Sequence, residues 1–244
     1  METDRNIFYK QAGAYTAFHK KLGVLLEPYL DKRWDVVDIG CGLAFIDFEI
    51  APHVKSVTAV DIDAEIIDEV KEQIDEKLWG EHARKAEIAP IVADWKCLDD
   101  AAWDVVMTCF YSVPFDEMKD LLAKGRRRAI LIVHGRKPNG KFDPLEDEAR
   151  KCTAEDMESY LKREGYRYRK NVAELQFGQP FKTIEDIHLF LNQFPGFAGP
   201  VLDEDFDPEK HMLSTEERII KTNRYDYPYY LPKSFNVAIF VVVK

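Results

Sequence analysis

Cysteine is scarce in this sequence, and the cysteines present show no ligand spacing. Four of them are scattered over 244 residues without a CxxC or CxxH pair, so no zinc site is indicated. Histidine, aspartate and glutamate form no cluster at metal-ligand spacing either, and we expect no bound metal. Scattered thiols are typical of a reducing compartment, and we expect a cytoplasmic protein.

Positive charge and long apolar runs are lacking as well. The 34 Lys and Arg face 44 Asp and Glu, for a net charge of −10, so we expect no broad basic face and neither nucleic acid nor membrane as a partner. The longest apolar runs are only strand-sized, and none at the N-terminus has the pattern of a signal peptide or a membrane span. The remaining composition, 46% apolar and 12% aromatic, is that of a globular domain.

Between about residues 34 and 175, short β-rich runs alternate with segments of helical period. This alternation predicts a parallel sheet with helical crossovers. The expected strands are 35–39, 56–60, 87–92, 103–110, 129–134 and 166–175, and the expected helices are 43–51, 64–78, 115–123 and 154–164. Thr153 and Asp156 predict a capped start for the last of these helices, and Gly165 predicts its end.

Two segments fall outside this alternation. Residues 1–33 carry apolar and aromatic residues at helical spacing, which predicts a helical cap ahead of the sheet. After residue 175 we expect a helix at 184–193, a short helix near 215–221 and a final strand at 235–243. An insertion of this length is expected to form a lid or substrate-facing subdomain. The predicted domains are 1–33 as the cap, 34–175 as the cofactor-binding domain, 176–234 as the lid and 235–244 as the final strand.

A glycine turn joins the first expected strand to the following helix. The strand ends in Asp38, Gly40 and Gly42, and glycine lets the backbone come close to a ligand because it has no Cβ. A dinucleotide fingerprint would need Gly or Ala three residues after Gly42, where Phe45 stands, and no Gly-Lys-Ser or Gly-Lys-Thr of a phosphate loop follows. The turn therefore fits neither of the common phosphate-binding motifs.

Acidic residues end the second and third expected strands. Asp61 stands 21 residues after Gly40, where a carboxylate can accept hydrogen bonds from both hydroxyls of a ribose. Asp94 follows the third strand, where it could accept from an adenine amino group while Trp95 packs on the ring. Together these residues predict a ligand that carries a ribose.

The motifs VVDIGCGLA, AVDID, VADW and WDVVMTCFYSVP, in this order and spacing, resemble those of class I S-adenosylmethionine-dependent methyltransferases. The resemblance implies an α/β, Rossmann-like, doubly wound fold: a seven-stranded, mostly parallel sheet with an antiparallel last strand, an N-terminal helical cap and a lid insertion. It implies S-adenosylmethionine as the cofactor, with the glycine turn around the methionine part, Asp61 on the ribose and Asp94 on the adenine. The cofactor-binding residues it implies are Tyr15, Asp38, Gly40, Cys41, Gly42, Asp61, Ile62, Asp94, Trp95 and Thr108.

The sequence departs from the family pattern at two motifs. The third glycine of the turn is replaced by Ala44, a small change that the turn should tolerate. The fourth motif reads CFYSVP and lacks the Asn/Asp-Pro-Pro-Tyr form that the family uses on nucleobase amines. We therefore expect in-line methyl transfer to a small-molecule acceptor.

The catalytic group and the assembly are left open by the sequence. His134 ends the fifth expected strand and is a candidate general base; the alternative is an ordinary hydrogen-bonded histidine at a strand end. A homodimer also stays open. Two other functions remain: a non-catalytic S-adenosylmethionine-binding regulatory module, and an NAD(P)-dependent oxidoreductase. Phe45, and the lack of a Tyr-x-x-x-Lys pair after the fourth strand, count against the oxidoreductase.

Overall fold

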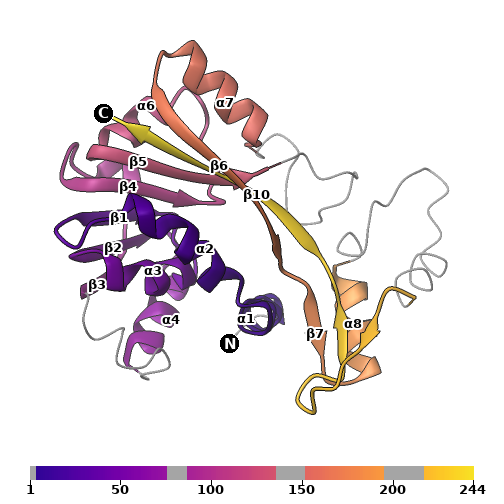
Figure 1. Cartoon of the computed structure of the whole chain (residues 1–244). Helices are drawn as coiled ribbons and strands as arrows, with labels where there is room; N and C mark the ends of the chain where they lie inside the picture. Colours follow the sequence, from indigo (N-terminus) through magenta and orange to yellow (C-terminus); the bar gives the residue numbers. More distant parts are fainter. Residues whose placement is uncertain (1–3, 76–86, 136–151, 195–216) are drawn as a thin grey trace. The chain divides into compact units, whose positions relative to one another are not determined.

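The computed structural model describes residues 4–75, 87–135, 152–194 and 217–244. By their contacts the described residues form two compact units (Figure 1). The first, which we call the sheet unit, contains residues 19–75, 87–135, 152–173 and 236–244. The second unit contains residues 4–18, 174–194 and 217–235. None of the described helices has the length and apolarity needed to cross a membrane.

The sheet unit is built on seven strands in the order β3-β2-β1-β4-β5-β10-β6. Their bounds are β1 Asp35–Ile39, β2 Ser56–Asp61, β3 Glu87–Val92, β4 Trp103–Cys109, β5 Gly125–His134, β6 Arg167–Gln176 and β10 Ser234–Val243. Strands β1 to β5 pair in parallel, and β10 runs antiparallel to β5. The predicted α/β class with an antiparallel last strand is confirmed. Strand order reverses between β1 and β4, and ligands of such sheets bind at this point.

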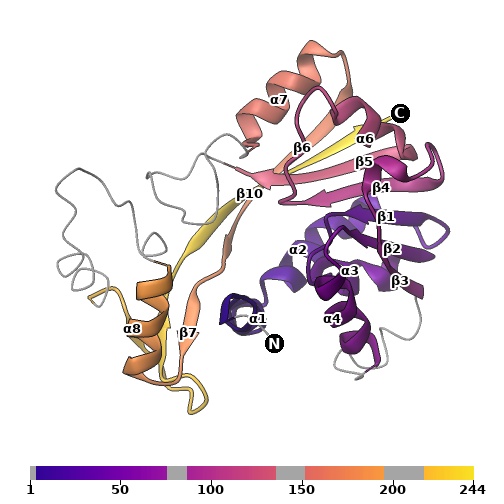
Figure 2. The same ribbon diagram turned by 180° about the vertical axis from the view of Figure 1, so that it is seen from behind.

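Helices cover both faces of this sheet. They are α2 Phe18–Leu26, α3 Phe45–Ile50, α4 Ala64–Asp75, α6 Met118–Ala123 and α7 Ala154–Arg163, with 3₁₀ turns η1 Glu27–Tyr29, η2 Ala51–His53 and η3 Trp95–Cys97. Helix α4 packs beside β2 and β3 (Figure 2). The capping box of α7 between Thr153 and Asp156 is present, and Gly165 ends the helix with φ +74°. Both caps were predicted from the sequence.

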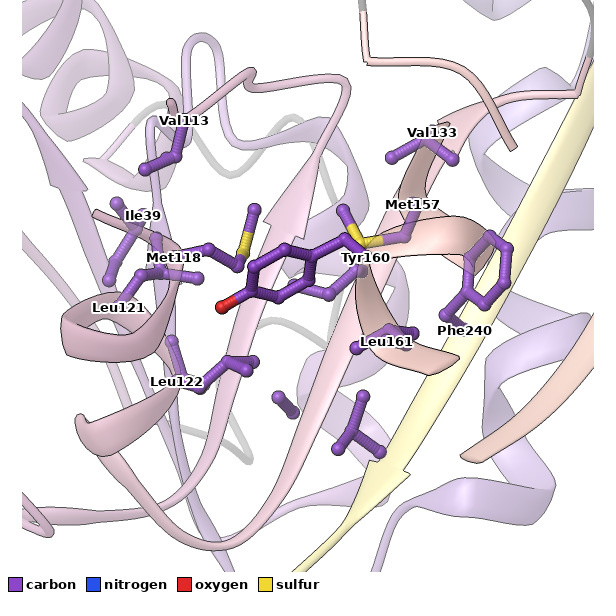
Figure 3. Close-up of a cluster of buried hydrophobic side chains, with 14 of the residues drawn as sticks. Ile39, Val113, Met118, Leu121, Leu122, Val133, Met157, Tyr160, Leu161 and Phe240 are labelled. Carbon is purple, nitrogen blue, oxygen red and sulfur yellow. The ribbon is translucent and has the colours of Figure 1, made fainter. Parts of the chain in front are cut away.

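The core on one face is formed by α6 and α7 (Figure 3). Leu121 and Leu122 of α6, and Leu161 of α7, lie almost wholly out of solvent against strand residues that include Ile39 and Phe240. Burying a leucine side chain stabilises the fold by about 1.5 to 3 kcal/mol. Ile39, at the carboxyl end of β1, belongs to this core and also lines the candidate site.

The second unit contains a small sheet that the sequence did not reveal. Its strands are β7 Gln179–Phe181, β9 Tyr229–Leu231 and β8 Ile220–Lys221, all antiparallel, and helices α1 Asp4–Thr16 and α8 Ile184–Gln193 belong to the same unit. The helix predicted near 215–221 is wrong at its end, because Ile220 and Lys221 pair with β9. A helix of one or two turns has little stability of its own, so strand pairing prevails; residues 215 and 216 lie outside the described residues.

The predicted cap and lid can be compared with these units. Helix α1 groups with the described residues of the predicted lid, whereas most of α2 groups with the sheet. Strands β6 and β10 carry the chain from one unit into the other. The role of residues 176–234 as a lid stays a prediction.

Candidate functional site

A small hollow of about 50 Å³, partly open to solvent, lies at the carboxyl ends of β1, β2 and β3 and beside the residues that follow β4. It is lined by Ile39, Gly40, Val60, Asp61, Ile62, Ala93, Asp94, Trp95 and Tyr111. Gly40, Asp61, Ile62, Asp94 and Trp95 had been selected from the sequence. The structure therefore brings together residues from three separate motifs.

The glycine turn is tied to the end of β2. The N–H groups of Gly40 and Cys41 both donate to the Val60 carbonyl, at 2.8 and 3.0 Å. Gly40 and Gly42 have φ values of +70° and +52°, which suit glycine. Ala44 has a φ of +55°, so a residue with a Cβ occupies the left-handed region here. The turn accommodates the change from the family pattern, but in a strained conformation.

Asp61 is held in place by two backbone groups. Its Oδ2 accepts from Gly42 N at 3.0 Å, and its Oδ1 accepts from Asp63 N at 3.1 Å. Each carboxylate oxygen keeps a further lone pair. The carboxylate is thus fixed beside the turn and can still accept from the two hydroxyls of a ribose.

Asp94 and Trp95 form the side of the hollow after β3. Asp94 caps η3, because its Oδ1 accepts from Lys96 N at 3.0 Å, and its second oxygen remains able to accept. Trp95 is 7% exposed and packs into the core while it lines the hollow. Ile62, at 74% exposure, supplies an apolar surface at the hollow's rim. A flat ring system fits between such apolar groups.

Asp38 lies beneath the turn and does not line the hollow. It is fully buried, as is Asp47 of α3, and neither carboxylate has a hydrogen-bond partner among the described residues when both are ionised. Burial raises the pKa of Asp38 to about 8, and burial and Asp38 hold the pKa of Asp47 well above its ordinary value. Since a carboxylate only accepts, one proton between them would give an O–H···O bond. We conclude that the pair holds a proton at neutral pH.

Asp47 was missed in the sequence. It stands in FIDFEI, and an acid between Ile46 and Phe48 on a short helix was a signal of a buried carboxyl group. Cys41, by contrast, is a half-buried residue of the turn, and its predicted contact with the cofactor stays a prediction. Its thiol donates to the Gly42 carbonyl at 3.5 Å, and burial raises its pKa, so it is no thiolate nucleophile.

The residues at the end of β4 and β5 lie beside the hollow. Thr108 is buried in β4, at 3% exposure, and is not among the lining residues. Phe110 has a φ of +55°, and its N–H donates to the Ile132 carbonyl at 2.8 Å. His134 is also outside the lining; its ring lies 4.9 Å from that of Phe110. Its role as a base stays a prediction.

Tyr15 belongs to the second unit. Its ring stacks on that of Tyr230 at 4.9 Å, and the Arg224 guanidinium lies 4.6 Å from its centroid. The positive charge beside the Tyr15 ring is therefore that of Arg224, a side chain of the chain itself. The predicted contact between Tyr15 and the cofactor stays a prediction. Over the described ranges, no group of three or more His, Cys, Asp or Glu side chains is placed to hold a metal ion.

Comparison with known proteins agrees with this arrangement. Residues 36–129 match the family model described as a methyltransferase domain, and no curated protein matches the chain. Protein YcgJ of Bacillus subtilis is similar at 14% identity and a TM-score of 0.57, over 93% of this chain and 98% of that one. The magnesium protoporphyrin IX methyltransferase of Synechocystis PCC 6803, with bound SAH, is similar at 13% identity and a TM-score of 0.55, over 100% of this chain and 89% of that one. The [4+2]-cyclase SpnF is similar at 15% identity and a TM-score of 0.54, over 92% of this chain and 80% of that one. At such identities the neighbours show the fold alone.

Proposed function

We propose that this chain, whose residues 36–129 form an S-adenosylmethionine-dependent methyltransferase domain, transfers the methyl group to a small-molecule acceptor. One observation carries the proposal: a single hollow brings Asp61, Asp94 and Trp95 together beside the glycine turn. Its described lining contains no Lys or Arg. Phe45 stands where a dinucleotide fingerprint needs Gly or Ala, and this favours a cofactor without a pyrophosphate over NAD(P).

The residues of the hollow fit the cofactor. Bound S-adenosylmethionine supplies a methyl group already activated by the sulfonium. Asp61 would accept from the ribose hydroxyls, Asp94 would accept from the adenine amino group, and Trp95 would pack on the ring. The protein's remaining task is to align the acceptor with the methyl group and to exclude water.

A small acceptor is supported by what the chain lacks. A net charge of −10 disfavours a nucleic-acid backbone, and CFYSVP differs from the motif used on nucleobase amines. Among the neighbours, the Synechocystis enzyme is named for a porphyrin, which is a small molecule. Residues 176–234 would supply specificity, as a lid over the acceptor.

Calorimetric titration with S-adenosylmethionine, S-adenosylhomocysteine and NADH tests the cofactor assignment. We expect the first two to bind and NADH to give no heat of binding. Binding of NADH alone would refute the assignment. Formation of S-adenosylhomocysteine in the presence of candidate acceptors then separates an enzyme from a binding module, which would bind the cofactor without turnover.

His134 is the proposed general base for an acceptor that must lose a proton. His134→Ala should lower kcat by on the order of 100-fold with unchanged cofactor affinity. The acidic limb of the pH–rate profile should disappear with it, because that limb reports protonation of the base. A near-native rate in His134→Ala would assign the residue to structure.

A further inference from the structure

Tyr111 follows β4, but its side chain contacts the ends of other strands. A Cβ built on Gly40, at the end of β1, would collide with the Tyr111 ring and would stand 2.9 Å from the Tyr111 Cβ. Trp95, which follows β3, lines the same hollow as Tyr111. Because the strand order is β3-β2-β1-β4, the side chain extends from β4 across the end of β1 toward the loop after β3.

The Tyr111 ring covers Gly40 and leaves Gly42, the other glycine of the turn, uncovered. A Cβ on Gly42 would meet no atom of the described residues within 4 Å, whereas the three nearest atoms to a Cβ on Gly40 all belong to Tyr111. Gly40, and not Gly42, lines the hollow with Asp94 and Trp95, so a ligand held there that contacts the turn does so at Gly40. The Tyr111 ring therefore occupies part of the path that an extended ligand needs.

Phe110, the residue before Tyr111, has a strained backbone conformation. Phe110 has a φ of +55°, which is unfavourable for a residue with a Cβ. It is kept there by the hydrogen bond from its N–H to Ile132 and by its ring contact with His134. Strained residues of this kind persist only where the surroundings hold them, and they gather at sites that switch between conformations.

The Tyr111 phenol stays uncharged when its ring covers Gly40. Burial raises the pKa of Tyr111, and the nearby carboxyl groups of Asp61, Asp94 and Glu117 raise it further. The phenol therefore stays neutral between acidic neighbours. With 37% of its surface exposed, the side chain can leave Gly40 without disturbing the buried core.

We propose that Tyr111 is a gate on the hollow and that the gate is closed in this structure. Its ring must leave Gly40 before the methionine part of the cofactor can lie on the turn. This inference rests on the proposed function. A gate of this kind lowers the apparent affinity by the fraction of molecules that are open. Removing the ring should therefore improve binding, which is the opposite of the effect expected for a side chain that only forms a wall.

The test compares Tyr111→Ala and Tyr111→Phe with the wild type, using S-adenosylhomocysteine in calorimetry and in stopped-flow association. Tyr111→Ala should bind on the order of tenfold more tightly and associate faster, as for a gate that is open in about a tenth of the molecules. Tyr111→Phe keeps the ring and should change affinity by less than about threefold. Tyr225→Ala, at a fully exposed tyrosine, is the matched control. Weaker binding by Tyr111→Ala would overturn the gate and make the residue a wall of the site.

A second readout needs no ligand. In the closed state Tyr111 shields Trp95, so Tyr111→Ala should increase acrylamide quenching of tryptophan fluorescence. The increase should vanish when both proteins also carry Trp95→Phe. Unchanged quenching would overturn the closed position itself. If quenching increases but no variant binds the cofactor, the Tyr111 ring does cover the hollow, and the proposed function is refuted. The proposal that Tyr111 gates cofactor binding is then refuted as well.

Discussion

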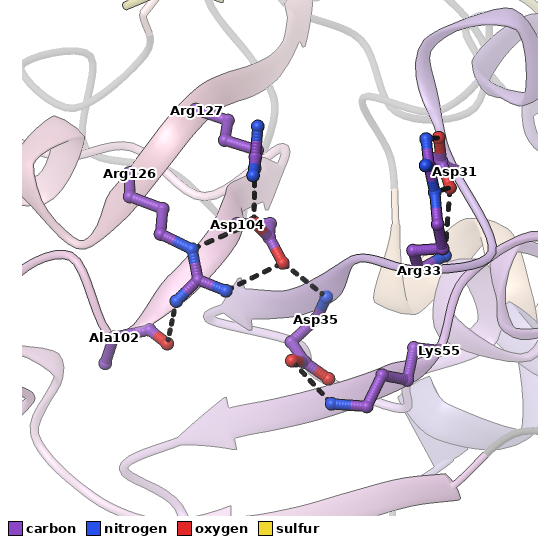
Figure 4. Close-up of polar contacts among 8 residues, drawn as sticks. All are labelled: Asp31, Arg33, Asp35, Lys55, Ala102, Asp104, Arg126 and Arg127. Atoms are coloured by element: carbon purple, nitrogen blue, oxygen red, sulfur yellow. Dashed lines mark hydrogen bonds and ion pairs between the residues drawn. The ribbon is translucent and has the colours of Figure 1, made fainter.

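Buried carboxyl groups at the two ends of the parallel strands have opposite surroundings. At the amino end, Asp104 of β4 is 3% exposed and accepts from Arg126, Arg127 and the Asp35 N–H at 2.6 to 3.2 Å (Figure 4). At the carboxyl end, Asp38 of β1 is fully buried and faces another acid. Desolvation raises the pKa of both carboxyl groups, but the arginines outweigh it at Asp104, whose pKa is lowered.

This contrast separates the end that stabilises the sheet from the end that binds. At the amino end, hydrogen-bond donors replace the water that the Asp104 carboxylate loses on burial. These hydrogen bonds stabilise that end of the sheet. The carboxyl end keeps a buried acid pair without a basic partner and two non-glycine residues at positive φ, Ala44 and Phe110, whereas the amino end has one such residue, Ala101 before β4. Proteins accept such local costs where a ligand must be bound. Substitutions at the two ends should therefore have different consequences.

The largest effect of a single substitution is expected at the amino end. Asp104→Ala leaves the Asp35 N–H without its acceptor and two arginines without their shared carboxylate, and should lower the free energy of unfolding by about 3 kcal/mol. Urea unfolding measures this loss, and cofactor affinity of the folded protein should not change. Asp31→Ala is the control: it breaks an exposed pair with Arg33 (Figure 4) and should leave stability as it is. Equal losses in both variants would contradict the contrast.

At the carboxyl end, loss of Asp61 should weaken cofactor binding in addition to any cost in stability from the Gly42 and Asp63 N–H groups that lose their acceptor. Asp61→Ala should weaken cofactor binding by about 1 to 3 kcal/mol, because ribose hydroxyls would lose their acceptors. Calorimetry with S-adenosylhomocysteine measures the change. Asp63→Ala, at a neighbouring acid that caps α4 outside the hollow, is the matched control. Unchanged affinity in Asp61→Ala would refute the assignment of this carboxylate to the ribose.

Sequence reasoning succeeded where a signal is local. The strands Asp35–Ile39 and Glu87–Val92 and the helix Ile184–Gln193 match their predicted bounds, since apolar period and caps are written in neighbouring residues. The strands β7, β8 and β9 have two or three residues each, too few for an alternation to show. The covering of Gly40 by Tyr111 depends on which strands are neighbours, and periodicity does not record that.

The acid pair at the carboxyl end should make stability depend on pH. Its raised pKa means that the folded protein keeps a proton that the unfolded chain releases above about pH 4. The contribution of the pair to stability is therefore full below that pH and falls as the pH rises toward 8, the pKa of Asp38, by up to about 1.4 kcal/mol per pH unit for each proton that the pair keeps. Asp47→Asn supplies a permanent amide donor to Asp38 and should flatten this slope. Urea unfolding between pH 5 and 8 compares the two; parallel curves would show that no proton is shared.

The smallest effect is expected at Ala44, where opposing terms nearly cancel. Ala44→Gly should relieve the cost of φ +55°, about 1 kcal/mol, but it frees the unfolded chain by about 0.4 to 1 kcal/mol and removes a buried methyl group. We expect a change in unfolding free energy of less than about 1 kcal/mol. Ala59→Gly is the matched control, because Ala59 is buried in the same apolar cluster on the regular strand β2. It loses the same methyl group with no strain to relieve, so it should be the more destabilising change. If the two substitutions cost the same, the left-handed turn stores no strain, and the carboxyl end of the sheet would differ from the amino end in its charges alone.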